Sequence, residues 1–176
     1  GILSEGLAAI AARVTGIDMS EDAIAAACGH NTFENLDYEC VSTSRHADQR
    51  GANYDVLTCM ELLEHVPDPK ALVSDCQKLV KPGGHLFFST INRNLASYVK
   101  LVLAGEYFLN MLPRGTHDYG RFIKPSELAR WCRQCGLEIR EISGMEYSPI
   151  TRGYFLVEQP KTNYLIHAVK PEEHAP

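Results

Sequence analysis

The sequence has no excess of basic residues, no cleavable signal-peptide pattern and no unbroken apolar run that would make a convincing transmembrane helix. Its 17 Lys and Arg are outnumbered by 22 Asp and Glu, and the net charge is −5. This balance argues against a nucleic-acid binder that relies on a broad basic surface. With 176 residues, 45% of them hydrophobic and 22% charged, the chain is long enough for one globular domain with its own core.

The cysteines lack the close, regular spacing of a disulfide framework. They lie at positions 28, 40, 59, 76, 132 and 135, mostly within expected helices or strands. A reducing compartment explains this distribution best. The one CxxC motif, Cys132 to Cys135, falls inside a helical pattern without a second CxxC, so we expect two small residues packing on a helix and not a metal or redox site.

The chain also lacks an initial methionine and a glycine-rich turn between a first strand and a helix. It begins at Gly1 and enters a helical pattern over residues 2–12 directly. We therefore expect a piece of a longer protein, with most of the glycine-rich loop and the strand before it preceding this chain. Only Gly1 could belong to that loop.

Strand and helix patterns alternate through residue 90, which predicts an α/β fold with a mostly parallel sheet covered on both faces. We expect strands at 13–18, 36–41, 54–60, 85–90, 137–145 and 164–169, and helices at 2–12, 21–28, 69–80 and 126–134. Ser20 and Ser126 are expected to cap helices, and Gly136 to end one. Residues 42–53 are polar and turn-rich, and 81–84 form a turn. The last two strands suggest an antiparallel hairpin at one edge. We expect one domain over 1–170, with an insertion at 91–124 and a tail at 171–176.

The most informative stretch is CMELLEHVPDP, residues 59–69, where an expected buried strand passes into the next helix. Ligands bind at this edge of open α/β sheets. Glu61, Glu64 and His65 lie within five residues and could hold a divalent cation or move a proton. Carboxylates favour Mg²⁺, whereas imidazole suits Zn²⁺ or Fe²⁺ better. The alternative is that Glu64 and His65 only orient the helix.

Asp18 closes the second strand expected for such a sheet, where an acid can accept hydrogen bonds from both ribose hydroxyls of a nucleotide-like cofactor. The alternative is an ordinary helix-capping or solvated aspartate.

Residues 95–112 are rich in apolar side chains but are interrupted by Lys100, Gly105 and Glu106. Periodicity alone favours a core-facing helix. A segment that touches a bilayer and admits an apolar tail is the other interpretation.

Five motifs together resemble the ubiquinone-biosynthesis O-methyltransferases: TGIDMS, TCMELLEHV, LVKPGG, STINRN and GTHDYGRFIKP. The resemblance covers nearly the whole chain, from Gly1 to about Ala168. It implies a class I, Rossmann-like methyltransferase sheet of seven strands, whose first, central strand this chain lacks. It also implies methyl transfer from S-adenosylmethionine to a hydroxyl of a polyprenylated catechol or demethylubiquinol, although the chain alone need not be active.

The resemblance assigns roles position by position. Gly1, Asp18 and Met60 resemble cofactor-binding residues, and Glu61, Glu64 and His65 resemble a magnesium site. Glu64 and His65 are the expected catalytic residues. A bound cation would lower the pKa of the catechol hydroxyl, and without a metal His65 is the best general base.

The resemblance also implies partners and a location. We expect peripheral membrane contact through 95–112, at the cytoplasmic face of a bacterial inner membrane or the matrix side of the mitochondrial one, and a quinone-synthesis complex as a further partner. Three alternatives stay open: a methyltransferase for another small phenol, a noncatalytic scaffold subunit, and an NAD-dependent Rossmann enzyme.

Overall fold

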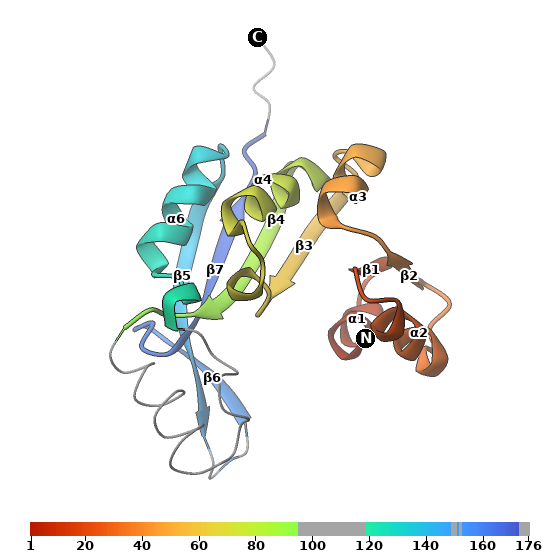
Figure 1. The fold of residues 1–176 in the computed structure, drawn as a ribbon, viewed down its shortest axis with the longest axis horizontal. Helices are drawn as coiled ribbons and strands as arrows, with labels where there is room; N and C mark the ends of the chain where they lie inside the picture. Colours follow the sequence, from red (N-terminus) through yellow and green to blue (C-terminus); the bar gives the residue numbers. More distant parts are fainter. Residues whose placement is uncertain (95–118, 149–150, 152, 173–176) are drawn as a thin grey trace. The chain divides into compact units, whose positions relative to one another are not determined.

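A computed structural model describes residues 1–94, 119–148, 151 and 153–172. These residues fall into two compact units, residues 1–50 and residues 51–176 (Figure 1). Each unit is described by itself, so the expectation of a single domain over 1–170 stays a prediction. The expected insertion at 91–124 and the apolar segment 95–112 lie wholly or mostly outside the described residues, as does most of the tail.

The first unit contains two parallel strands and three helices. They follow the order α1 (Ile2–Ala8), β1 (Val14–Asp18), α2 (Glu21–His30), β2 (Leu36–Cys40) and α3 (Thr43–Arg50). The register runs from Val14 opposite Leu36 to Asp18 opposite Cys40. Ser20 caps α2 as predicted, because its hydroxyl accepts from the backbone N–H of Ala23 at 3.2 Å. The sequence patterns at 13–18, 21–28 and 36–41 are thereby confirmed.

Two expectations for this unit are wrong. The first helix ends at Ala8 and not at residue 12. The polar stretch 42–53 contains the helix α3 in place of turns, and Ser42 begins it by accepting from the N–H of Arg45 at 3.3 Å. Only His46 and Ala47 of this helix are buried, so the sequence carries too short an apolar stripe to reveal a helix.

The second unit is a five-stranded mixed sheet in the order β3-β4-β7-β5-β6. Its elements are β3 (Tyr54–Met60), the 3₁₀ helix η1 (Leu63–His65), α4 (Pro69–Leu79), β4 (Val80–Ile91), η3 (Tyr119–Arg121), α6 (Pro125–Gln134), β5 (Glu138–Ser148), β6 (Gly153–Val157) and β7 (Asn163–Val169). β3 and β4 are parallel, and the other three neighbouring pairs are antiparallel. The α/β fold with a mixed sheet is confirmed.

The predicted C-terminal hairpin is right in its pairing and wrong in its place. β5 and β7 are antiparallel neighbours, as expected. However, β6 lies between them in the sequence and forms the edge, whereas β7 inserts between β4 and β5. β6 was missed because its apolar residues do not alternate with polar ones, so they lack the pattern of a half-buried strand.

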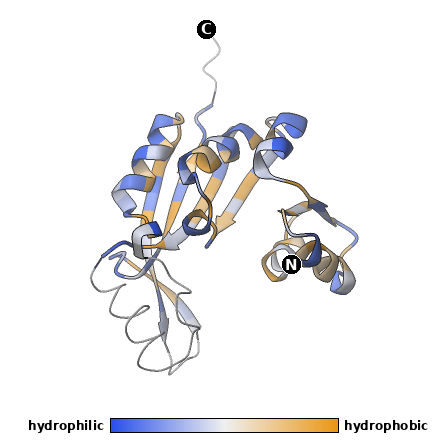
Figure 2. Ribbon diagram, in the orientation of Figure 1, coloured by the Kyte–Doolittle hydropathy of each residue, from blue (hydrophilic) through white to orange (hydrophobic). Residues whose placement is uncertain are grey.

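The core of the second unit lies between the sheet and the helices α4 and α6, which cover one face of it (Figure 1). Figure 2 shows apolar residues along the strands under these helices. The strands contribute fully buried side chains such as Leu86, Phe88 and Ile166, and the helices contribute Val73 and Leu128. Burying a side chain of this size stabilises the fold by about 1.5–3 kcal/mol.

Local signals at helix and strand ends are mostly confirmed. Gly83, in the expected turn at 81–84, has a φ of +78°. Between two consecutive pairs of the parallel register, β4 advances from Val80 to His85, whereas β3 advances only from Tyr54 to Val56. The turn is therefore a bulge inside β4. Gly136 ends α6 with a φ of +79°.

One helix cap was placed wrongly. α6 begins at Pro125 with Lys124 as its N-cap residue, so Ser126 lies inside the helix and does not cap it. Glu127 supplies the capping contact, since its Oε2 accepts from the N–H of Lys124 at 3.0 Å. Among the described helices, none has both the length and the apolar composition needed to cross a membrane.

Candidate active site

Asp18 is the exposed last residue of β1, as the sequence predicted. Its Oδ1 accepts from the backbone N–H of Ser20 at 2.8 Å, and within the described part of the chain its Oδ2 has no hydrogen-bond partner. One oxygen therefore fixes the turn between β1 and α2. The other is free to accept from a ligand, which fits a ribose hydroxyl of S-adenosylmethionine.

A side chain at Gly1 would force a neighbouring side chain of the first unit to move. A Cβ atom at Gly1 would lie 2.5 Å from the hydroxyl of Tyr38 and 3.2 Å from the Cβ of Ala27. The Tyr38 hydroxyl also donates to the Gly1 carbonyl at 3.2 Å. Close backbone approach of this kind is what a cofactor loop requires of its glycines.

The other predicted site residues belong to the second unit, at the carboxyl end of β3. Met60 is the half-buried last residue of β3 and lies opposite Ser89 of β4. Glu61 follows with a φ of +50°, the only positive φ among the described non-glycine residues. A glutamate rarely adopts this left-handed conformation, which costs about 1–3 kcal/mol and occurs mainly at functional sites.

The Glu61 turn is held by hydrogen bonds from two other strands. Its backbone N–H donates to the carbonyl and to the hydroxyl of Ser89, both at 3.1 Å. Its Oε1 accepts from the Ser89 hydroxyl at 2.7 Å, and its Oε2 accepts from the side-chain amide of Asn163 at 3.1 Å. Both carboxylate oxygens are thus engaged.

Glu64 lies in η1 and is only 4% exposed. Its Oε2 accepts from the hydroxyl of Thr90, at the end of β4, at 2.6 Å. Its Oε1 is buried and has no hydrogen-bond partner within the described residues. A buried acceptor without a partner is costly, so it marks a place where a ligand or a substrate group can be satisfied.

The surroundings of Glu61 raise the pKa of its carboxyl group. Loss of hydration is the main cause that raises the pKa of Glu61, although part of its side chain is exposed. The nearby charge of Glu64 raises it further, whereas the hydrogen bonds from Ser89 and Asn163 and the neighbouring His65 oppose the shift. A carboxylate whose pKa is raised by lost hydration and by a neighbouring carboxylate is typical of a functional site.

The predicted magnesium ligands do not assemble into a coordination set in this structure. Within the described residues, no three His, Cys, Asp or Glu side chains are grouped so that they could hold a metal ion. The carboxylate of Glu61 accepts hydrogen bonds from Ser89 and Asn163, and that of Glu64 is buried and accepts one from Thr90. His65 is exposed at the end of η1. Magnesium therefore stays a prediction.

Sequence reasoning missed the polar residues that hold the glutamates. Ser89 and Thr90 belong to the STINRN motif, which was noticed only for its family resemblance, and Asn163 gave no signal at all. The same motif fastens the chain before β7. The N–H of Asn92 donates to the carbonyl of Thr162 at 2.7 Å, and the side-chain amide of Asn94 donates to the backbone carbonyl of Lys161 at 2.6 Å.

The CxxC motif has no reactive thiol of the redox type. Cys132 is buried, and burial is the first cause that raises its pKa to about 12. The hydrogen bond with Cys59 and then burial raise the pKa of Cys76. Reactive cysteines need a lowered pKa. Cys132 belongs to the core cluster and Cys135 packs against it, which fits the interpretation as packing residues.

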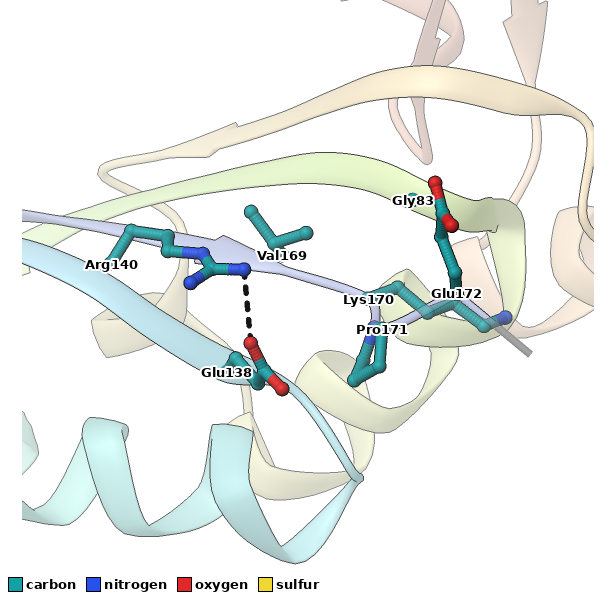
Figure 3. Close-up of a pocket in the computed structure, with 7 residues that line it drawn as sticks. All are labelled: Gly83, Glu138, Arg140, Val169, Lys170, Pro171 and Glu172. Carbon is teal, nitrogen blue, oxygen red and sulfur yellow. Dashed lines mark ion pairs between the residues drawn. The ribbon is translucent and has the colours of Figure 1, made fainter. Parts of the chain in front are cut away.

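A pocket of about 320 Å³ lies beside Gly83, near the amino end of β4 (Figure 3). Ser89, the β4 residue that binds Glu61, lies toward the carboxyl end of the same strand. Gly83, Lys170 and Glu172 line it, together with an ion pair in which Arg140 lies 3.0 Å from Glu138. In this class of fold ligands bind beyond the carboxyl ends of the strands. The pocket lies near the amino end of β4, so we do not place the reaction there.

Comparisons with solved structures support the fold. A SAM-dependent methyltransferase from Methanosarcina mazei matches with a TM-score of 0.66 at 20% identity, covering 96% of this chain and 86% of that one. The magnesium protoporphyrin IX methyltransferase of Synechocystis PCC 6803 matches with a TM-score of 0.62 at 18% identity, covering 96% and 68%. At such identities the likeness concerns the fold alone.

Comparisons of sequence go further. The model of the methyltransferase domain family matches residues 1–142. The ubiquinone biosynthesis O-methyltransferase of Aromatoleum aromaticum is 54% identical over 170 residues, which are 96% of this chain and 73% of the relative. That of Acinetobacter baumannii strain AYE is 48% identical over 173 residues, 97% of this chain and 73% of the relative. With the exposed acid that ends β1 and the strained, hydrogen-bonded glutamate that follows β3, these matches show that the chain belongs to the ubiquinone biosynthesis O-methyltransferases, a family of SAM-dependent methyltransferases.

Proposed function

We propose that this protein transfers the methyl group of S-adenosylmethionine to a hydroxyl oxygen of a polyprenylated catechol or demethylubiquinol during ubiquinone biosynthesis. The observation that carries the proposal is the 48–54% identity, over nearly the whole chain, to relatives named for this O-methylation. The polyprenyl tail and the catechol are the finer part of the proposal.

The first unit supplies the cofactor side. S-adenosylmethionine, when bound, offers a methyl group on a positively charged sulfur. In our proposal the free Oδ2 of Asp18 accepts from a ribose hydroxyl, and the backbone at Gly1, kept free of a side chain by Tyr38, lies against the cofactor. The family resemblance predicts a cofactor contact for Met60, the half-buried last residue of β3.

The residues after β3 supply the acceptor side. The acceptor hydroxyl must lose its proton as its oxygen forms a bond to the methyl carbon and the sulfur–methyl bond breaks. His65 is exposed and carries an imidazole, the side chain that most often acts as a general base. Glu64 keeps one buried oxygen free for a hydrogen bond from the acceptor. Positioning of the two reactants supplies most of the remaining acceleration.

Magnesium is a separate arm of the proposal. Glu61, Glu64 and His65 carry the donor types that a cation would use, but Glu61 would first have to release Ser89 or Asn163. We therefore assign no step to a metal. Thorough chelation with EDTA, followed by Mg²⁺, decides the question: full activity after chelation removes the metal, and loss that Mg²⁺ alone restores supports it.

We propose further that the protein works as a peripheral protein at the cytoplasmic face of a bacterial inner membrane, or at the matrix side of the mitochondrial one. The apolar segment 95–112 and the polyprenylated acceptor motivate this. Liposome flotation should weaken when Leu101 and Leu103 become Glu in a protein that still unfolds cooperatively. Unchanged flotation contradicts the membrane contact. A quinone-synthesis complex is the proposed further partner, and co-purification with other enzymes of the pathway tests it.

Methyl transfer is tested with labelled S-adenosylmethionine and two acceptors, a catechol with a short polyprenyl tail and the same catechol without it. We expect labelled product with the tailed acceptor and much less with the bare one. Equal methylation of both would favour an enzyme for small phenols. Failure to bind S-adenosylhomocysteine in a calorimetric titration would contradict the methyltransferase function and leave a scaffold role.

A further inference from the structure

The left-handed conformation of Glu61 needs an outside support. A glutamate at a φ of +50° persists only when its surroundings hold it there. The support comes from Ser89, which binds both the backbone and the side chain of Glu61, and from Asn163, which binds the remaining carboxylate oxygen. Glu61 directly follows β3, Ser89 lies on β4 and Asn163 begins β7.

Asn163 is itself held firmly. As the first residue of β7 it lies opposite Ile91 of β4 on one side and Met145 of β5 on the other. The residues before it are fastened by hydrogen bonds from Asn92 and Asn94 to backbone carbonyls, including the side-chain bond of Asn92 to Pro160. The amide of Asn163 therefore has a fixed origin from which to reach Glu61.

The support is neutral in charge. Asn163 and Ser89 donate hydrogen bonds but bring no positive charge, and Arg93, which follows β4, pairs with Glu127 of α6. Hydrogen bonds to a carboxylate are strong and directional. Their role at Glu61 is therefore to orient it and not to neutralise it.

We infer that Asn163, acting with Ser89 through the Glu61 carboxylate, is a positioning residue for methyl transfer. It holds the turn that follows Met60 and thereby places Glu64 and His65 toward the acceptor. The inference rests on the proposed function for its effect on catalysis. Its structural half, that Asn163 holds the turn, stands on the hydrogen bonds alone.

The experiment compares Asn163→Leu, which has a similar volume but no donor, with wild type. We expect kcat to fall by about 10- to 100-fold, as expected when a catalytic group loses its position, with little change in the KM for S-adenosylmethionine. Ile166→Val, a loss of one methylene in the same strand, is the control for stability. At a comparable drop in melting temperature it should leave kcat within about twofold of wild type.

A double-mutant cycle separates positioning from general damage. In a Glu61→Ala background, Asn163→Leu should change kcat by less than about twofold, because the group through which it acts is gone. An undiminished effect in that background, or a kcat near wild type for Asn163→Leu alone, overturns the inference. Ser89→Ala should reproduce the loss seen with Asn163→Leu.

Hydrogen exchange without cofactor or acceptor tests the structural half independently. Asn163→Leu should speed the exchange of the Glu61 amide by about tenfold or more, since opening of this turn becomes easier. Unchanged exchange contradicts the inference even where methyl transfer is normal. Conversely, if Asn163→Leu speeds this exchange but the wild-type protein transfers no methyl group, the proposed function is refuted and the support at Glu61 stands.

Discussion

Replacing Asp18 with Asn should weaken cofactor binding without disturbing the fold. The two carboxylate oxygens have different tasks: Oδ1 accepts from the N–H of Ser20 at 2.8 Å, and Oδ2 is free within the described residues. Asparagine keeps one oxygen for the Ser20 bond. It replaces the other with an NH₂ group, which cannot accept from a ribose hydroxyl.

The magnitude follows from the chemistry of that one bond. A hydrogen bond to a charged group contributes about 1.5–3 kcal/mol. At about 1.4 kcal/mol per tenfold change, the dissociation constant of S-adenosylhomocysteine should rise by about 10- to 150-fold. Asp18→Ala also removes the bond to Ser20, so it should lower the melting temperature as well.

Calorimetric titration with S-adenosylhomocysteine measures the effect, and thermal unfolding checks the fold. Asp22→Asn is the matched control, because it makes the same change of charge in the first turn of α2, shortly after Asp18 in the chain. The control should leave the dissociation constant within about twofold, since an exposed charge at this range is largely screened. Equal weakening by both variants, or less than about threefold by Asp18→Asn, would refute the ribose role.

Three further predictions concern single residues. The raised pKa of Glu61 means that the unfolded chain loses this proton at a lower pH than the folded protein, so the contribution of Glu61 to stability falls as the pH rises from its ordinary pKa of 4.5 through the raised pKa. Glu61→Gln should lack this part of the pH dependence, as followed by thermal unfolding at several pH values, and an unchanged pH dependence would contradict the raised pKa. Gly144→Ala should destabilise the protein by about 1–3 kcal/mol in denaturant titration, because its Cβ would lie 2.1 Å from the carbonyl oxygen of Gln159; unchanged stability would contradict the close approach. With a disulfide reagent at pH 8, the exposed Cys28 should react about 100-fold or more faster than the buried Cys132, whose pKa is raised to about 12, and similar rates would contradict that burial.

Elements with a strong local signal were predictable from the sequence. The strand predicted at 54–60 matches β3 at both ends, although β3 is only partly buried and contains the exposed Asp55. The helix expected at 69–80 ends only one residue earlier, at Leu79, and begins where Asp68 accepts from the N–H of Ala71 at 2.9 Å. Caps and apolar runs are local, so they can be read without the fold.

Elements that depend on long-range packing were not predictable. The helix α3 buries only two residues, and β6 is a short edge strand in which Tyr154 and Leu156 remain 71% and 64% exposed. Neither has the regular apolar face on which pattern recognition depends. The places of Asp18 and Glu61 at the ends of β1 and β3 were predictable, because they follow from chain order, and their roles stay predictions.

The supports of the site could not have been found by sequence reasoning, and the sheet topology explains why. Ser89 is 28 residues from Glu61, and Asn163 is 102 residues away. β3 and β4 are parallel, so the ends of both strands meet at one edge and bring Ser89 to Glu61. β7 runs antiparallel to β4, so its first residue and not its last lies at that edge. Had β7 been the outer strand of a hairpin, as the sequence suggested, Asn163 would not lie beside β4. The insertion of β7 between β4 and β5 thus gives Glu61 a hydrogen-bond donor, Asn163, at the start of β7. Substitutions that shift the register of β7 should therefore impair catalysis before they unfold the sheet.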